Sequence, residues 1–226
     1  VVAGNATTAR VKELAEKWFS NIPAGEKYIR QLPAEPKQTA PRKEIVKANV
    51  PIDAFYKCWH MDARLDDGYY AAELITDILS GGGSSRLYQA LVKEQQLFSN
   101  IDCYHFGSTD AGILTIEGKL IRGVKMEEAE KAVEAELEKI KTILIEEKEL
   151  QKVKNKTEAS LAFEDMSIMS RASSLANYEL LGNAGLINEE LDKYNSITRE
   201  DIQCYARKIF DVNNSNTLYY YAEEKS

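Results

Sequence analysis

Three glycines followed by two serines and an arginine, at residues 81–86, form the part of this sequence most suited to binding or chemistry. The run leads directly into a segment whose apolar residues recur at helical spacing. Backbone N–H groups at a helix start attract anions, so one interpretation is a phosphate site. A phosphate-binding loop also needs a lysine, and none follows Gly83. We therefore favour a tight, close-packed turn in which Ser84 or Ser85 caps the helix.

Histidines and cysteines are the other residue types that bind metals or act as nucleophiles. The two histidines, His60 and His105, lie in separate strand-like segments, so no zinc site is predicted. The three cysteines, Cys58, Cys103 and Cys204, are too few and too scattered for a disulfide framework. They are expected to be buried thiols, with one bridge and one free thiol as the alternative.

Composition narrows the class of protein. The chain has 226 residues with 44% hydrophobic content, enough for one large domain or one domain plus a fragment. Its net charge of -7 arises from interspersed charges, which disfavours binding to nucleic acid or to an anionic membrane. No apolar run approaches the roughly 20 residues that a membrane-spanning helix needs. Because the chain begins without methionine or a targeting segment, we expect a piece of a longer protein.

The first 42 residues have two different compositions. Residues 1–25 predict a short strand and then a helix, with Thr7 or Thr8 as N-cap and apolar residues at helical spacing. Residues 26–42 predict an extended linker, because prolines recur among charged and small residues. The apolar residues of the helix are Val11, Leu14, Ala15, Trp18 and Phe19. Pro23 follows the helix, and the prolines of the linker are Pro33, Pro36 and Pro41.

The next segments predict strands around two helices. Residues 43–49 and 52–61 read as strands that pair with each other, although the partner of either strand could lie elsewhere. One helix is predicted over 68–79, and the segment after the glycine run, which holds Leu87, Tyr88, Leu91 and Val92, is predicted to be the second. Alternating residues at 98–106 and 112–120 predict two more strands joined by a turn.

The rest of the chain is predicted to be mostly helical. Helices are expected over residues 125–145, 147–163, 166–181 and 186–194. Thr198 and Asp201 have the spacing of a capping box, which opens a further helix to Phe210. A tyrosine-rich strand over 217–222 closes the chain. Apolar residues between Glu158 and Ser174, including Phe163, Met166 and Met169, are expected to be core. The order of elements favours an α+β fold.

Taken with its flanks, the glycine run resembles that of the M16 zinc peptidases, the family of pitrilysin, insulinase and the mitochondrial processing peptidase. The similar part is their carboxy-terminal, non-catalytic domain. The resemblance implies an M16-type α/β roll, with a mainly antiparallel sheet and helices packed on one face. It also implies that residues 1–25 are the tail of a preceding domain, 26–42 a linker and 43–226 the C-terminal-type domain.

The family's catalytic device is His-x-x-Glu-His on a helix, where two histidines bind zinc and the glutamate acts as general base. This sequence lacks that motif. The resemblance therefore implies zinc in the parent enzyme, with no metal bound by this chain and no catalytic residue within it.

The family also implies residues that contact substrate. Its glycine segment faces the peptidase chamber, so Gly81, Gly82, Gly83, Ser84, Ser85 and Arg86 are implied to line a peptide-binding space. Many members place an arginine and, seven residues later, a tyrosine that bind the substrate backbone. Val92 and Ser99 stand at those positions here and cannot make the same contacts. Either Phe98, Tyr104 or Arg86 supplies the missing contacts with the substrate, or this domain only encloses the substrate. If the alignment with the family is shifted by one residue, Phe98 stands at the tyrosine position.

Two functions follow from the resemblance. The first is the substrate-enclosing domain of a zinc metalloendopeptidase that acts on peptides or unfolded polypeptides, with the zinc-binding N-terminal domain or subunit as partner. The fragment alone is then expected to be inactive. The second is an inactive partner or structural subunit of a heteromeric complex. Neither nucleic-acid binding nor a membrane span is expected, and both the bacterial periplasm and the cytoplasm remain open as compartments.

Overall fold

The computed structural model describes residues 1–28, 32–33, 35–107 and 109–223. The chain divides into two compact units. The sheet unit comprises Gln38–Glu158 and Glu190–Ser226, and the helical unit comprises Val1–Lys37 and Ala159–Glu189. Among the described residues, no helix is both long enough and apolar enough to cross a membrane.

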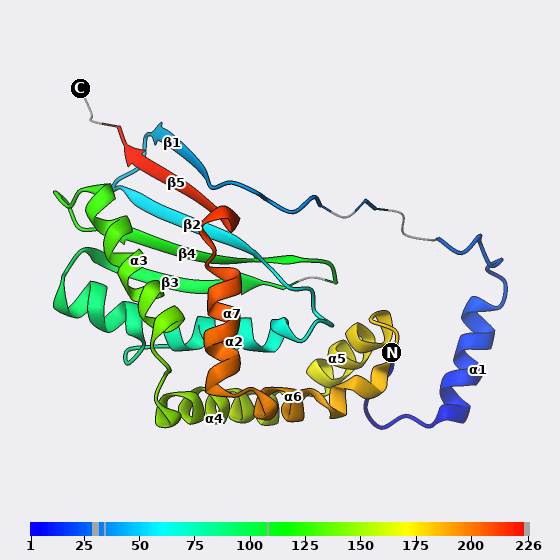
Figure 1. Cartoon of the computed structure of the whole chain (residues 1–226). Helices are drawn as coiled ribbons and strands as arrows, with labels where there is room; N and C mark the ends of the chain where they lie inside the picture. The colour runs from blue at the N-terminus through cyan, green and yellow to red at the C-terminus, as the bar shows by residue number, and fades with distance from the viewer. Residues whose placement is uncertain (29–31, 34, 108, 224–226) are drawn as a thin grey trace. The chain divides into compact units, whose positions relative to one another are not determined.

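The sheet unit is built on five strands in the order β1-β5-β2-β4-β3 (Figure 1). Neighbouring strands are antiparallel except for β1 and β5, which run parallel. This confirms the mainly antiparallel sheet. The strands are β1 (Arg42–Ala48), β2 (Ala54–Met61), β3 (Phe98–Phe106), β4 (Gly112–Leu120) and β5 (Ser215–Ala222).

The predicted pairing of the first two strands is wrong. The C-terminal strand β5 lies between β1 and β2 and hydrogen-bonds to both. Gln38 helps to place β1, because its side-chain amide donates to the carbonyl of Ser215 at 2.9 Å and accepts from Asn216 at 3.0 Å. Short chain separation favoured a hairpin, but the last strand supplies the partner of both strands.

The helices of the sheet unit lie in the predicted regions. Thr198 and Asp201 form the predicted capping box at the start of α7. The segment after the glycine run is a π-helix, and the region 186–194 divides into a 3₁₀ turn and α6. The helices are α2 (Gly68–Ser80), the π-helix η1 (Tyr88–Glu94), α3 (Met126–Thr142), α4 (Glu147–Glu164), α6 (Glu190–Ser196), α7 (Arg199–Ile209) and the 3₁₀ turn η3 (Val212–Asn214).

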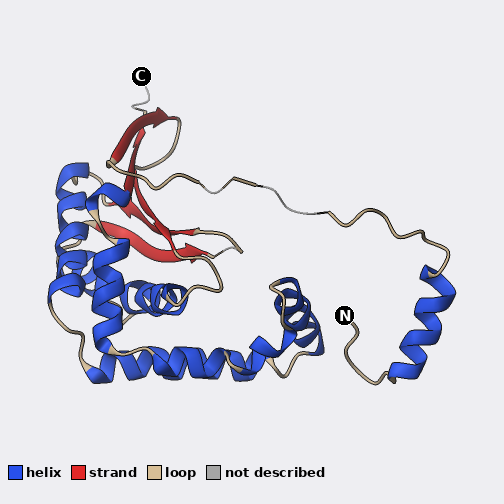
Figure 2. Cartoon of the chain, turned by 45° about the vertical axis from the view of Figure 1, so that its right-hand side comes forward, coloured by secondary structure: helices blue, strands red, loops and turns tan. Residues whose placement is uncertain are grey.

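One face of the sheet is covered by helices (Figure 2). Because successive strand residues point to opposite faces, every second residue of each central strand faces this layer. Helices α2, α3 and α7 all contact β2. The fully buried residues of this core include Phe55 and Trp59 of β2, Leu114 and Ile116 of β4 and Tyr219 of β5. The expected α+β fold with helices on one face is therefore confirmed.

The helical unit contains α1 (Thr8–Phe19), α5 (Ile168–Leu180) and the 3₁₀ turn η2 (Ala184–Asn188). Thr7 caps α1, as predicted, by accepting a hydrogen bond from the backbone of Arg10. The strand expected before α1 is absent: no residue of 1–6 is assigned to a strand. An isolated segment cannot form a strand without a partner for its backbone groups.

The predicted core role of the apolar residues between Glu158 and Ser174 is wrong. Phe163, Met166 and Met169 are 72%, 78% and 76% exposed. The apolar stripe of α1 is present in sequence, but no residue of that helix is buried. Apolar periodicity predicts which face of a helix can be buried, and burial also requires a neighbouring layer.

Gly118 of β4 generates the first prediction. A Cβ atom at this position would lie 2.6 Å from the ring of Phe98, which is fully buried. Replacing Gly118 with alanine therefore forces a tightly packed ring to move, and overpacking of this kind costs about 1–3 kcal/mol. We expect Gly118→Ala to lower the free energy of unfolding in urea by that amount.

Gly25→Ala is the control, because a Cβ at Gly25 meets no atom within 4 Å. Its free energy of unfolding should stay within about 0.5 kcal/mol of the native chain's. Equal stability of Gly118→Ala and the native chain would contradict the packing of β3 against β4 described above.

Candidate functional site

The glycine segment makes a tight turn at the end of α2. The N–H of Gly81 donates to the carbonyl of Asp77 at 2.7 Å, and that of Ser85 donates to the carbonyl of Gly82 at 2.9 Å. Gly82 has φ of +121°, a conformation that favours glycine. A Cβ on Gly81 would lie 2.3 Å from the Asp77 carbonyl oxygen. The turn predicted from the sequence is present, and two of its glycines are required by its geometry.

Neither serine caps the helix, contrary to the prediction. The π-helix is flanked by Leu87 and has no side-chain cap. Ser84 instead accepts a hydrogen bond from the Lys152 ammonium at 2.5 Å. Among the described residues, the buried hydroxyl of Ser85 has no hydrogen-bond partner.

Arg86 connects this segment to α4. Its Nε and Nη2 atoms donate to the two carboxylate oxygens of Glu149 at 2.8 and 2.6 Å. These bonds raise the pKa of Arg86, although its burial acts in the opposite direction. A paired, half-buried guanidinium fixes the position of the glycine segment against the helix that begins at Glu147.

The residues at the family's arginine and tyrosine positions differ from one another in burial and contacts. Val92 is half-buried within η1, and Phe98 is fully buried beneath Gly118. Ser99 is exposed on β3, and its hydroxyl donates to the carbonyl of Lys119 at 3.1 Å. Of the aromatic residues considered as substitutes, only Tyr104 lies on the sheet face that points away from the helices.

That second face, which we call the open face, carries polar and aromatic side chains that belong to no sequence motif. The alternation of residues along the strands is the sequence signal that indicates this face. Phe106 and Ile113 are 61% and 37% exposed, and the rings of Tyr104 and Phe106 lie 5.3 Å apart. Its residues include Glu44, Tyr56, Cys58, His60, Asp102, Tyr104, Phe106, Ile113, Thr115, Glu117, Lys119, Leu218 and Tyr220.

Glu117 lies on the part of the open face formed by β4, between β2 and the edge strand β3. It is paired in register with Tyr56 on one side and with Asp102 on the other. The hydroxyl of Tyr104 donates to its carboxylate at 2.9 Å. Burial, followed by this hydrogen bond, raises the pKa of Tyr104 to about 12. Burial and the charge of Glu117 also raise the pKa of Tyr56. The tyrosines therefore stay neutral and surround a carboxylate.

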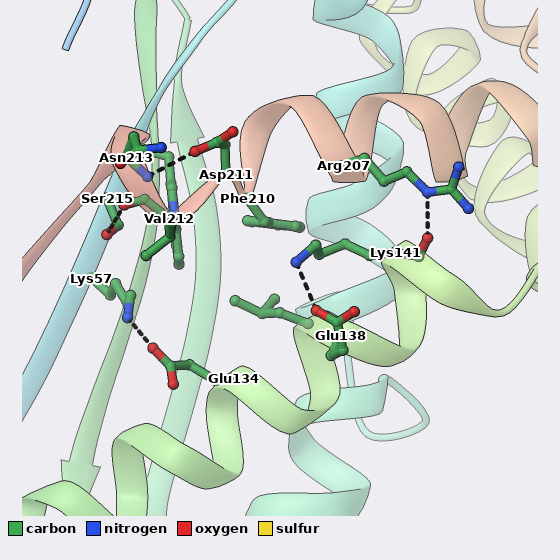
Figure 3. Close-up of a pocket in the computed structure, with 12 residues that line it drawn as sticks. Lys57, Glu134, Glu138, Lys141, Arg207, Phe210, Asp211, Val212, Asn213 and Ser215 are labelled. Atoms are coloured by element: carbon green, nitrogen blue, oxygen red, sulfur yellow. Dashed lines mark hydrogen bonds and ion pairs between the residues drawn. The ribbon is translucent and has the colours of Figure 1, made fainter. Parts of the chain in front are cut away.

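A pocket of about 540 Å³ lies on the other, helix-covered face (Figure 3). Its charged side chains are largely paired with one another. Lys57 contacts Glu134 at 2.6 Å, and Lys141 contacts Glu138 at 2.7 Å. The Nε of Arg207 donates to a backbone carbonyl of α3. Because these pairs satisfy the charges that a ligand would use, we place the candidate site on the open face and the glycine segment.

Beside this pocket, Glu130 of α3 accepts hydrogen bonds from three strands. They come from Lys43 of β1 at 3.1 Å, Lys57 of β2 at 2.9 Å and Tyr219 of β5 at 2.5 Å. Burial alone would raise the pKa of Glu130, but the hydrogen bonds from Tyr219 and Lys57 outweigh it and lower the pKa to about 2. Glu130 therefore fastens α3 to the sheet.

The possible metal ligands are dispersed. His105 contacts Tyr69 of α2 at 3.3 Å on the helix-covered side, whereas His60 belongs to the open face. Within the described ranges, no three histidine, cysteine, aspartate or glutamate side chains are grouped to hold a metal ion. The three cysteines are free thiols, and Cys204 is exposed rather than buried as predicted.

Known proteins resemble this chain in sequence and in fold. The family described as the peptidase M16 inactive domain matches residues 1–157. The chain belongs to the M16 peptidase family. The uncharacterized zinc protease YmxG of Bacillus subtilis is 26% identical over 215 residues, which cover 92% of this chain and 50% of YmxG.

Solved structures share the fold across nearly the whole chain. A protease from Helicobacter pylori superposes with a TM-score of 0.89 at 23% identity, covering 96% of this chain and 54% of its own. The M16 inactive domain from Pseudomonas fluorescens gives a TM-score of 0.81 at 19% identity, covering 99% and 52%. The chain spans about half the length of the curated relatives it matches, which are named zinc proteases.

Glu130 generates a pH-dependent prediction. Its pKa in the folded chain, about 2, lies below its ordinary value of 4.5. The ionised carboxylate therefore stabilises the fold above pH 4.5, and this stabilisation is lost as the pH falls from 4.5 toward 2. Glu130→Gln should lower the free energy of unfolding at pH 7 by about 1–3 kcal/mol. The difference between the variant and the native chain should shrink in acid.

Urea unfolding at pH 7, 5 and 3 measures this difference. Glu138→Gln serves as the control, because Glu138 is exposed and, among the described residues, its carboxylate pairs with Lys141 of its own helix alone. A difference for Glu130→Gln that stays constant from pH 7 to pH 3 would contradict the assignment of Glu130 as the ionised link between α3 and the sheet.

Proposed function

We propose that this chain is the substrate-enclosing domain of an M16 zinc metalloendopeptidase. The observation that carries the proposal is the two-sided sheet: helices cover one face, while half-buried aromatic and polar side chains lie on the other. A polypeptide held against that face would be shielded from water on one side without the domain supplying a reactive group. The domain would bind and orient polypeptide and would leave hydrolysis to another part of the enzyme.

The partner in this proposal is the zinc-binding N-terminal domain or subunit. The relatives named zinc proteases are about twice as long as the segment matched here, which supports a second half of similar size. The described residues offer no group of metal ligands. The zinc of the parent enzyme would therefore be held by the other half, and this chain would close the space over it.

The glycine segment lies beside one edge of the open face. The hydroxyl of Ser80, at the end of α2, donates to Asp102 of the edge strand β3 at 3.4 Å. Gly82, Gly83 and Ser84, which follow, are exposed. In the proposal this segment lines the same polypeptide space as the open face, and its lack of bulky side chains lets an extended chain approach its backbone.

The alternative is an inactive partner or structural subunit of a heteromeric complex. Val92 and Ser99 favour it, because neither side chain supplies the contacts that an arginine and a tyrosine would give a substrate. The same fold would then present its open face to a protein partner. The reconstitution experiment below separates the two functions.

The first test combines this chain with its natural zinc-binding half. Cleavage of a quenched-fluorescent unfolded polypeptide should require both halves and zinc, and a chelator should abolish it. The chain alone should show no cleavage, since the described residues hold no zinc site. A well-formed complex that cleaves no peptide at any zinc concentration would favour the inactive-subunit alternative.

A second test addresses the glycine segment. A Cβ at Gly83 would meet no atom within 4 Å, so a large side chain there should leave the fold intact. If Gly83 lines the polypeptide space, Gly83→Arg should raise the KM of the reconstituted enzyme for a long unfolded substrate. Gly25→Arg is the control, because its Cβ position is equally open. Equal KM values for both variants and the native enzyme would place the segment outside that space.

A further inference from the structure

The structure assigns a cation-binding subsite to the open face: Glu117, with the rings of Tyr56 and Tyr104, binds the lysine or arginine side chain of a polypeptide. This inference rests on the proposed function and deepens it by naming a class of substrate side chain. It goes beyond enclosure, because a surface that only encloses would accept any side chain at this position.

The position of Glu117 favours a cationic occupant. Glu117 is half-buried on β4, next to the edge strand β3, and lies opposite Tyr56 of β2. Its charge is not cancelled by the protein, since it has no ion pair among the described residues; the one hydrogen bond to its side chain comes from Tyr104. Lys119, two residues along β4 on the same face, is exposed and forms no ion pair with it there. Charge complementarity therefore selects a positive group from outside.

The tyrosine rings also attract a cation. Tyr56 and Tyr104 flank Glu117 from the two neighbouring strands, and Tyr220 is near enough to raise the pKa of Tyr56. A cation over an aromatic face is attracted to its π-electrons, and the attraction grows as water is excluded. The hydroxyl of Tyr104 also holds the carboxylate in place, so less freedom is lost when a cation binds.

The geometry suits the side chain of an extended polypeptide. The four-carbon stem of lysine or the three-carbon stem of arginine would pack along Tyr56 and Leu218, which are neighbours across β2 and β5. The charged end would then reach Glu117 on the next strand. A free metal ion is less suited to this place, because hard cations take six or more oxygen ligands. Glu117 and Asp102, its neighbour in register on β3, supply only two carboxylates, and that of Asp102 already accepts hydrogen bonds from Ser80 and Asn100.

The test measures binding of fluorescein-labelled dodecapeptides to the native chain by anisotropy. The peptides are alike except for one central residue: lysine, arginine, acetyl-lysine or citrulline. We expect the lysine and arginine peptides to bind about 3- to 10-fold more tightly than their neutral counterparts. Glu117→Gln should reduce this ratio to below about 2, with neutral-peptide binding unchanged.

Glu44→Gln is the matched control, because Glu44 lies on the same face in register with Leu218 but has no tyrosine directly opposite on β5. It removes the same charge and should preserve the preference for cations. Tyr104→Phe keeps the ring but removes the hydrogen bond to Glu117, and it should weaken the preference partly. Thermal melts of each variant establish that the fold is retained.

The outcomes separate this inference from the function on which it rests. Peptide binding without a cation preference, or with a preference that Glu117→Gln leaves intact, overturns the subsite while the enclosing role stands. No binding of any peptide up to millimolar concentration overturns both. A preference lost equally in Glu117→Gln and Glu44→Gln shows general surface charge and also overturns the subsite.

Discussion

The pairing of β5 with both β1 and β2 is the interaction on which the rest of the structure depends. This last strand joins β1, at the start of the sheet unit, to the antiparallel ladder formed by β2, β4 and β3. It also carries Tyr219, whose hydroxyl reaches Glu130 of α3. The strand therefore determines both the order of the sheet and the attachment of a covering helix. Such long-range pairing must form before the helix-covered core can be complete.

The second constraint is that a single layer of helices covers one face of a two-faced sheet. Along β2 the fully buried Phe55 and Trp59 alternate with half-buried Tyr56 and Cys58. The helix-covered side is a packed core with internally paired charges, so its groups are already used for stability. The open face keeps groups that can contact another molecule. Because side chains alternate between the two faces along each strand, stabilising contacts lie on one face and groups available for binding lie on the other.

We propose that this domain encloses the substrate and that another part of the enzyme hydrolyses it. This proposal agrees with membership of the M16 inactive-domain family. A domain without zinc ligands in its described residues can still contribute by shape, enclosure and selective contacts. The exposed apolar residues of the helical unit, such as Trp18 and Met166, show that burial in this chain is not set by apolar periodicity alone. Similar sequence patterns gave core residues in the sheet unit because helices and strands there form two layers.

The sequence by itself determined the position of nearly every element of the sheet unit, the capping box of α7 and the family. The elements and the capping box depend on local periodicity and capping, which act over a few residues, and the family resemblance depends on the glycine run at residues 81–86 and its flanks. Only the tertiary structure decided that β5 separates β1 from β2, that Arg86 pairs with Glu149, and that Glu117 lies among tyrosines from neighbouring strands. Each of these contacts joins residues at least 13 positions apart in the chain. No short motif records such neighbours, because strand order and register bring them together.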